Sequence, residues 1–167
     1  REGAYREAQL TYVKTTHLKA IAQQQNQIAL FDICYGLGYN TAAALETIWQ
    51  TNPHCQVTVV ALELDPRVPR QAIAQGLIQT ESTAVAHALT ELAQDLQISS
   101  DRLQAQLHIG DARRQIQTVV GQGFLADAIF LDPFSPPRCP QLWSVDFLGR
   151  VAACLKPTGT LATYSCA

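Results

Sequence analysis

The stretch FDICYGLGYNTAAAL, residues 31–45, places two glycines one residue apart between an apolar run and an alanine-rich run. The apolar run, residues 28–36, is short and closed by glycine, which is typical of a buried parallel strand. Asn40 or Thr41 can cap a helix that continues to a stop at Pro53. The stretch therefore predicts a strand, a glycine turn and a helix in succession.

The alternation of strand and helix continues along the chain. Apolar and β-branched runs predict strands at residues 56–65, 103–111, 126–132 and 160–166, and helical spacing predicts helices at 66–77, 82–98, 112–123 and 144–159. Residues 6–25 predict a short strand or turn and then a helix that ends near the glutamines. This order indicates an α/β fold, with a mostly parallel sheet and helices on both faces.

Length and composition narrow the class of protein. A chain of 167 residues suits one domain, and its net charge of −2 excludes a strong global attraction to nucleic acid, although basic residues can still gather locally. Five cysteines without a CxxC pair fit a reducing, cytoplasmic setting, and no apolar run approaches the ~20 residues that cross a bilayer. Because methionine is absent even at position 1, we expect a fragment of a longer protein, trimmed at both ends.

Residues able to bind a ligand follow four successive predicted strands. Gly36 and Gly38 follow the first strand, Glu63 ends the second, Asp111 follows the third and Asp132 follows the fourth. The carboxyl ends of parallel strands share one edge of the sheet, where α/β proteins bind ligands. Glycines let a backbone approach a ligand closely, and a carboxylate at the end of the second strand can accept hydrogen bonds from a ribose. The sequence therefore predicts a nucleoside-cofactor site at this edge.

These motifs resemble a known enzyme class. The D-x-x-x-G-x-G turn that begins at Asp32, with acids ending the next strands, resembles the class I S-adenosylmethionine-dependent methyltransferases. FLDPFSPPRCPQLW, residues 130–143, resembles the L-D-G-F-A-P-x-x-N-P-x-x-W segment of the MnmC-like methyltransferases, which finish 5-methylaminomethyl-2-thiouridine at the tRNA wobble position. CYGLGYN, residues 34–40, resembles their G-F-G-T-G-L-N turn, and residues 156–167 and 3–13 resemble further segments of the family.

The resemblance implies a Rossmann-like class I methyltransferase fold, divided into an N-terminal segment with a helix, residues 1–27, and a cofactor-binding domain, residues 28–167. The family's C-terminal hairpin is expected to be missing. The implied cofactor is S-adenosylmethionine, and no metal is expected. The residues that would bind this cofactor are Asp32, Gly36, Gly38, Asn40, Glu63 and Asp111.

The resemblance also implies a reaction and its partners. Asp132 would lie at the reaction centre. Phe134 and Pro136 would line the entrance through which the tRNA base reaches it, and Arg138 would contact a phosphate of the tRNA. The expected substrate is the aminomethyl nitrogen of a modified uridine in tRNA. An FAD-dependent oxidoreductase, fused or separate, is an expected partner, and a membrane is not.

Departures from the family pattern keep other functions open. Cys34 stands in place of the family's first glycine, and Pro133 in place of the glycine after the reaction-centre aspartate. One alternative is a methyltransferase for another amine such as an exocyclic base nitrogen, and a second is a degenerate scaffold without catalysis. A dehydrogenase fits least, because Thr41 occupies the third small position of the dinucleotide fingerprint.

Overall fold

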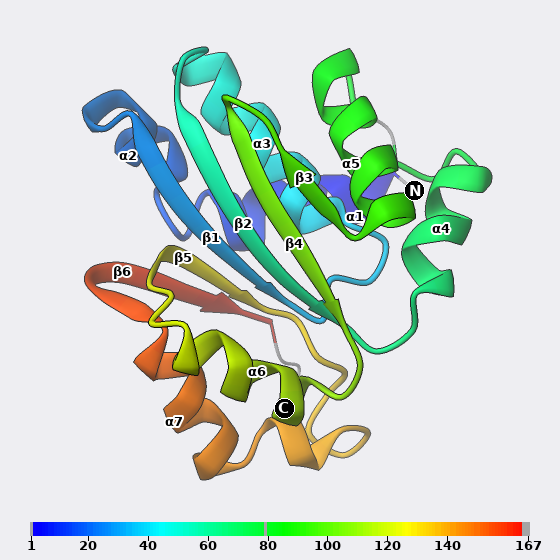
Figure 1. The fold of residues 1–167 in the computed structure, drawn as a ribbon, viewed down its shortest axis with the longest axis vertical. Helices are drawn as coiled ribbons and strands as arrows, with labels where there is room; N and C mark the ends of the chain where they lie inside the picture. The colour runs from blue at the N-terminus through cyan, green and yellow to red at the C-terminus, as the bar shows by residue number, and fades with distance from the viewer. Residues whose placement is uncertain (1, 79, 165–167) are drawn as a thin grey trace.

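The computed structural model describes residues 2–78 and 80–164, which form one twisted sheet with helices on both faces (Figure 1). The sheet has the order β3-β4-β2-β1-β5-β6. Its parallel strands are β1 (Gln27–Ile33), β2 (Gln56–Glu63), β4 (Leu103–Ile109), β5 (Ala126–Leu131) and β6 (Leu155–Thr163), and β3 (Gln97–Ser99) runs antiparallel to β4. The strand order reverses at β1, which has β2 on one side and β5 on the other.

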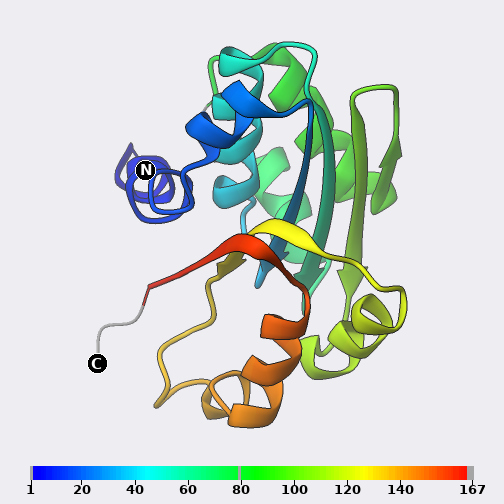
Figure 2. The same cartoon turned by 90° about the vertical axis from the view of Figure 1, so that its left-hand side faces the viewer.

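Helices cover the two faces unequally (Figures 1 and 2). On one face pack α3 (Tyr39–Thr51), α5 (Thr83–Asp95), α2 (Leu18–Gln24), the π-helix η1 (Ala8–Val13), and the flanking α1 (Glu2–Glu7) and α4 (Arg67–Ala74). On the other face pack α6 (Ala112–Gly121) and α7 (Val145–Ala153), preceded by the short η2 (Pro140–Leu142). The N-terminal helices α1, η1 and α2 pack against α3 and so belong to the helix layer on this face of the sheet.

Burial along the strands follows from this covering. Every residue of β5 is buried, as expected for a strand covered on both faces. In β1, Leu30 packs on the α3 side, while Phe31 and Ile33 pack against α6 and α7. Strand β4 alternates between buried and exposed residues, because Gln104 and Gln106 lie on a part of the sheet that no described helix covers.

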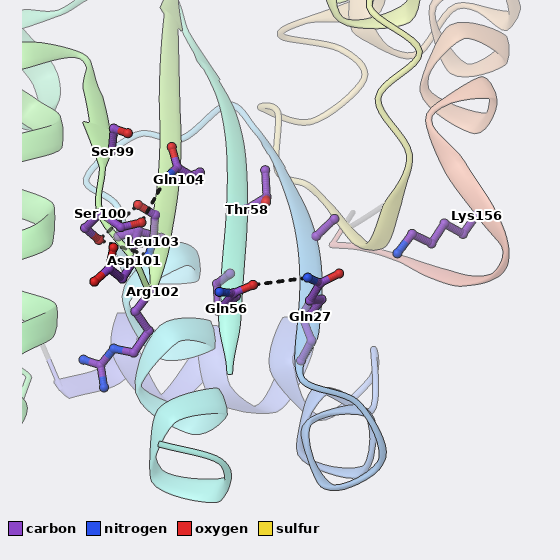
Figure 3. A pocket seen from close by; sticks show the side chains of 13 residues that line it. Gln27, Gln56, Thr58, Ser99, Ser100, Asp101, Arg102, Leu103, Gln104 and Lys156 are labelled. Atoms are coloured by element: carbon purple, nitrogen blue, oxygen red, sulfur yellow. Dashed lines mark hydrogen bonds between the residues drawn. The ribbon is translucent and has the colours of Figure 1, made fainter. Parts of the chain in front are cut away.

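That uncovered part holds a cavity at the amino ends of β1, β2 and β4 (Figure 3). Most of the labelled side chains that line this cavity are polar. The side-chain amide of Gln27 on β1 donates a hydrogen bond of 3.1 Å to the side chain of Gln56 on β2. Arg102, at the start of β4, stacks instead on the ring of Trp49 at 4.1 Å and bonds the carbonyl of Pro53. The cavity lies at the opposite edge from the residues that the sequence singles out.

Three expectations about secondary structure were wrong in detail. The segment expected to be a short strand or turn is helical at Ala8–Val13, because Ala8, Tyr12 and Val13 are buried against α3 at helical spacing. The helix predicted to reach residue 98 ends at Asp95, where Leu96 takes a left-handed φ of 62° and begins the turn into β3. The helix predicted to end at residue 159 stops at Ala153, and β6 already begins at Leu155.

The α/β class, the parallel strands and the helices on both faces are confirmed. Within the described residues β6 is an edge strand, and residues 165–166 of the predicted last strand lie outside them. Every helix in the described part of the chain is too short or too polar to cross a membrane.

Candidate functional site

A cavity of about 690 Å³ opens at the carboxyl ends of β1, β2, β4 and β5. Its size lies within the ~300–1,000 Å³ of small-molecule sites in proteins. Six of the ten residues predicted for the site line the cavity: Gly36, Asn40, Glu63, Asp111, Asp132 and Phe134. The other four, Asp32, Gly38, Pro136 and Arg138, do not line it.

The turn between β1 and α3 forms the floor of the cavity. Cys34, Gly36 and Gly38 have φ angles of 69°, 56° and 87°, all in the left-handed region. The backbone N–H groups of Cys34 and Tyr35 both donate to the carbonyl of Leu62 on β2, which ties the turn to the sheet. Helix α3 begins at Tyr39, so its first N–H groups have no acceptor within the helix and can donate to an anionic group.

Gly38 serves the site indirectly. A Cβ atom at this position would lie 2.6 Å from the hydroxyl oxygen of Tyr35 and 2.8 Å from its ring. Tyr35 is buried, and its side chain occupies the space that a residue with a side chain at position 38 would need. The second glycine of the turn therefore makes room for Tyr35, which itself lines the cavity.

Glu63 links the turn to the end of β2. One of its carboxylate oxygens accepts the N–H of Gly36 at 2.8 Å, and the other accepts the N–H of Asp65 at 2.9 Å. Each carboxylate oxygen has a second lone pair, so Glu63 can hold the turn and still accept hydrogen bonds from the hydroxyl groups of a ligand in the cavity. Sequence analysis predicted the second role but not the first, because the contact with Gly36 forms only when β1 and β2 pair.

Asp32 lies behind the turn and not in the cavity. Its side chain is fully buried and accepts a hydrogen bond of 2.6 Å from the hydroxyl of Thr41, which joins β1 to α3. Its other oxygen has no hydrogen-bond partner among the described residues. Burial raises the pKa of Asp32 to about 7, and the nearby charges of Asp132 and Glu63 add to the shift. Asp32 therefore supports the turn from within the core.

Asp111 caps helix α6 at the rim of the cavity. Its carboxylate accepts the N–H of Arg113 at 2.9 Å and pairs with the guanidinium of the same arginine at 2.6 Å. These interactions with Arg113 lower the pKa of Asp111. Asp65 and Arg67 repeat the arrangement after β2, with an ion pair of 2.6 Å. Both carboxylates line the cavity, and each is held by an arginine two residues further along the chain.

Asp132 and Phe134 lie at the mouth of the cavity. The amide nitrogen of Asn40 donates to a carboxylate oxygen of Asp132 at 3.1 Å, and this bond connects the start of α3 to the end of β5. Phe134 is 72% exposed, and the indole of Trp143 donates to its backbone carbonyl at 2.9 Å. An exposed aromatic side chain is thus presented on a fixed backbone beside an exposed carboxylate.

Pro136 and Arg138 belong to the same loop but lie away from the cavity lining. The backbone N–H of Arg138 bonds the carbonyl of Ser135, and its side chain is exposed. Contact of these two residues with a substrate stays a prediction.

Sequence analysis missed the part of the site that the N-terminal helices supply. Ala4 lines the cavity, and the hydroxyl of Tyr5 donates to the buried carboxylate of Glu46 on α3. Glu46 also accepts hydrogen bonds from Thr80 and from the backbone N–H groups of residues 81 and 82. It therefore ties the N-terminal segment to the loop before α5. The only available signal was an acid inside an otherwise apolar helical run.

Comparison with known proteins points to one family. The family model of S-adenosyl-L-methionine-dependent methyltransferases matches residues 74–167, more than half of the chain. The tRNA 5-methylaminomethyl-2-thiouridine biosynthesis bifunctional protein MnmC of Burkholderia multivorans is 29% identical over 98% of this chain and 26% of its own length. The protein of the same name from Chromohalobacter salexigens is 31% identical over 80% of this chain and 20% of its own length.

The fold agrees with these relatives. The crystal structure of MNMC2 from Aquifex aeolicus superposes with a TM-score of 0.81 and 29% identity, over 96% of this chain and 50% of that one. The chain spans about a quarter of the length of the first curated relatives it matches. From the family model, the relatives and this superposition, we conclude that the chain belongs to the S-adenosyl-L-methionine-dependent methyltransferases, in the MnmC-like family.

Proposed function

We propose that the protein containing this chain transfers a methyl group from S-adenosylmethionine to the aminomethyl nitrogen of a modified wobble uridine in tRNA. The observation that carries the proposal is the placement of Asp132. Its carboxylate lies at the mouth of the cofactor cavity, is held by Asn40 on one oxygen, and has the exposed ring of Phe134 beside it. The names of the two MnmC relatives, which refer to 5-methylaminomethyl-2-thiouridine biosynthesis, support the substrate class.

The cavity has the donors and acceptors that the cofactor requires. The N–H groups at the start of α3 would bind the carboxylate tail, and Glu63, which lines the cavity, would accept hydrogen bonds from the ribose hydroxyls. Asp111 would accept from the amino group of adenine, with the apolar residues of the cavity around the ring. The bound cofactor supplies an electrophilic methyl group on a positively charged sulfur.

Asp132 would prepare the amine for attack. A primary aliphatic amine is mostly protonated at neutral pH, as for a lysine with a pKa of ~10, so its lone pair must be freed. The carboxylate of Asp132 accepts an ammonium hydrogen bond, orients the nitrogen toward the cavity and passes the released proton to solvent. Methyl transfer forms the new carbon–nitrogen bond as the carbon–sulfur bond breaks, and the second proton on nitrogen leaves by the same route. Alignment of the reacting atoms supplies much of the acceleration.

Phe134 would hold the base. An exposed aromatic side chain can stack on a uracil that is turned out of the anticodon loop, and such stacking contributes ~1–3 kcal/mol per base. The hydrogen bond from Trp143 to the Phe134 carbonyl keeps this platform in place before the base arrives. Pro136 and Arg138, further along the loop, would contact the neighbouring nucleotides.

The remaining features of the whole protein are part of the same proposal. A tRNA partner, an FAD-dependent oxidoreductase partner, a cytoplasmic location and the division into residues 1–27 and 28–167 follow from the family resemblance. The word "bifunctional" in the names of the relatives agrees with a second activity in longer proteins.

Two measurements on the full-length protein test the proposal. The first is a calorimetric titration of S-adenosylhomocysteine into the native protein and into Glu63→Gln, which keeps the size of the side chain while removing its charge. We expect clear binding by the native protein and much weaker binding by the variant. The second is incubation of tRNA bearing 5-aminomethyl-2-thiouridine with S-adenosylmethionine, followed by mass spectrometry of the nucleosides.

We expect the modified uridine to gain one methyl group with the native protein. Asp132→Asn should abolish this gain while it leaves S-adenosylhomocysteine binding intact. Asp146→Asn, on the exposed surface of α7, is the matched control and should behave as the native protein does. Methylation of a free base nitrogen in place of the uridine would favour the other amine methyltransferase. Cofactor binding without any transfer would favour the scaffold.

A further inference from the structure

Tyr12 is a buried side chain without a hydrogen-bond partner, next to the reaction centre. It lies on the π-helix η1 and is 2% exposed. Its ring packs edge-on against Phe130 of β5, with the ring centroids 5.7 Å apart. Its hydroxyl is among the few buried polar atoms for which no described residue provides a hydrogen-bond partner. A buried hydroxyl without a partner is costly, so its retention calls for an explanation.

The contact with Phe130 places the Tyr12 ring on the face of the sheet to which Asp132 also belongs. Side chains two residues apart on a strand share one face of the sheet, so Asp132 follows Phe130 on the α3 side, where η1 packs. Three carboxylates act electrostatically on the hydroxyl: Asp132 after β5, Asp32 on β1 and Glu7 in α1. Of the three, Asp132 interacts most strongly with the phenol, although the hydroxyl makes no hydrogen bond of normal geometry to a described residue.

The state of Tyr12 follows from these surroundings. Burial, followed by the interaction with the Asp132 carboxylate, raises the pKa of Tyr12 well above its ordinary value. The phenol therefore keeps its proton throughout the physiological range and can act only as a donor toward a carboxylate. Asn40 already donates to one oxygen of Asp132 at 3.1 Å. With a second donor in place, the carboxylate would still have lone pairs to accept hydrogen bonds from a substrate amine.

We propose that Tyr12 is a positioning residue that donates its phenol hydrogen bond to Asp132 and, together with Asn40, holds this carboxylate in the orientation that receives the substrate amine. This inference rests on the proposed function of Asp132. It assigns a role at the reaction centre to the N-terminal segment, which lies outside residues 74–167. It also gives a reason for the buried hydroxyl of Tyr12, which no described residue partners.

The first test compares two tyrosine variants of the full-length protein. Tyr12→Phe keeps the ring that packs on Phe130 and removes only the hydroxyl. Tyr5→Phe is the matched control. It also removes a tyrosine hydroxyl from the N-terminal segment, but this hydroxyl donates to Glu46 and not to Asp132. The readouts are S-adenosylhomocysteine affinity, and the dependence of kcat and of KM for tRNA on pH.

We expect Tyr12→Phe to lower kcat by about tenfold or more, as for the loss of one hydrogen bond to a charged group. Cofactor affinity and KM for tRNA should stay close to native values, and the acidic limb of the pH–rate profile should move to higher pH. Tyr5→Phe should lower stability without moving that limb. A pH profile that is the same in Tyr12→Phe as in the native protein would overturn the inference.

A second measurement does not depend on methyl transfer. Tyrosine is labelled with ¹³C at the ring carbon that carries the hydroxyl, and the signals are assigned from single replacements by phenylalanine. Asp132→Asn should shift the Tyr12 signal and leave the Tyr5 signal in place. If the Tyr12 signal moves but no substrate is methylated, the contact stands and the proposed function fails. If the signal does not move, the inference itself is wrong.

Discussion

Cys34→Gly is expected to stabilise the protein relative to Cys34→Ala, although glycine usually destabilises. Cys34 has a φ of 69°, and its N–H and that of Tyr35 are both held by the carbonyl of Leu62. Because two successive N–H groups are held by one carbonyl of β2, the turn cannot relax to a negative φ when the side chain changes. Any residue with a Cβ at this position therefore keeps the strain of the left-handed conformation.

The size of the effect can be worked out from this geometry. A Cβ in the left-handed region costs ~1–2 kcal/mol, while glycine loses ~0.5–1 kcal/mol more backbone entropy than alanine on folding. The free energy of unfolding of Cys34→Gly should thus exceed that of Cys34→Ala by roughly 0.5–1 kcal/mol, the difference between these two terms. Alanine is the reference because both variants lose the same partly buried thiol.

Ala86→Gly on the exposed face of α5 is the control with the opposite sign. In a helix interior the same alanine-to-glycine change costs ~1 kcal/mol. The assay is urea unfolding followed by circular dichroism, with the slope m checked for equality among the variants. If Cys34→Gly proves less stable than Cys34→Ala, the strain at this turn is not what the geometry indicates, and the reasoning is refuted.

Three further predictions rest on single contacts. Gly38→Ala should lower the free energy of unfolding more than Gly76→Ala, since both have positive φ but only the Cβ at 38 would meet the Tyr35 side chain; equal losses in urea unfolding would contradict this. Glu46→Ala should cost about 2–3 kcal/mol, because several donors lose a charged acceptor; Asp146→Ala on the exposed surface of α7 is the control, and a loss no larger than in that control would oppose the assignment. Asp32 has a folded pKa of about 7 against an ordinary value of 3.8, so the folded state binds the extra proton and stability should fall as pH rises between these values. Asp32→Asn should remove this dependence in unfolding experiments from pH 4 to 8, and an unchanged slope would refute the burial argument.

Much of the site could be predicted from the sequence because it depends on local order along the chain. A strand that runs into glycines, followed by strands that end in acids, places Gly36, Glu63, Asp111 and Asp132 at one edge of any parallel sheet, and the structure brings all four to one cavity. The helix boundaries at Asp95 and Ala153 were less predictable. There, strand pairing with β4 and β5 outweighs the local preference for continuing the helix.

The roles of individual residues depended on contacts between distant segments. Gly38 and Asp32 belong to the motif, yet the structure shows Gly38 making room for Tyr35, and Asp32 buried beneath Thr41. The resemblance of residues 3–13 to a segment of the family assigned no role at the site to Tyr12, because its contact with Phe130 forms only after η1 packs on α3. The class of fold and the edge of the sheet that holds the cavity could be predicted from local patterns, since the alternation of strands and helices and the turn chemistry are local properties. Which of these residues reach the cavity and which support it depended on packing, because burial and hydrogen bonding are set by segments far apart in the chain.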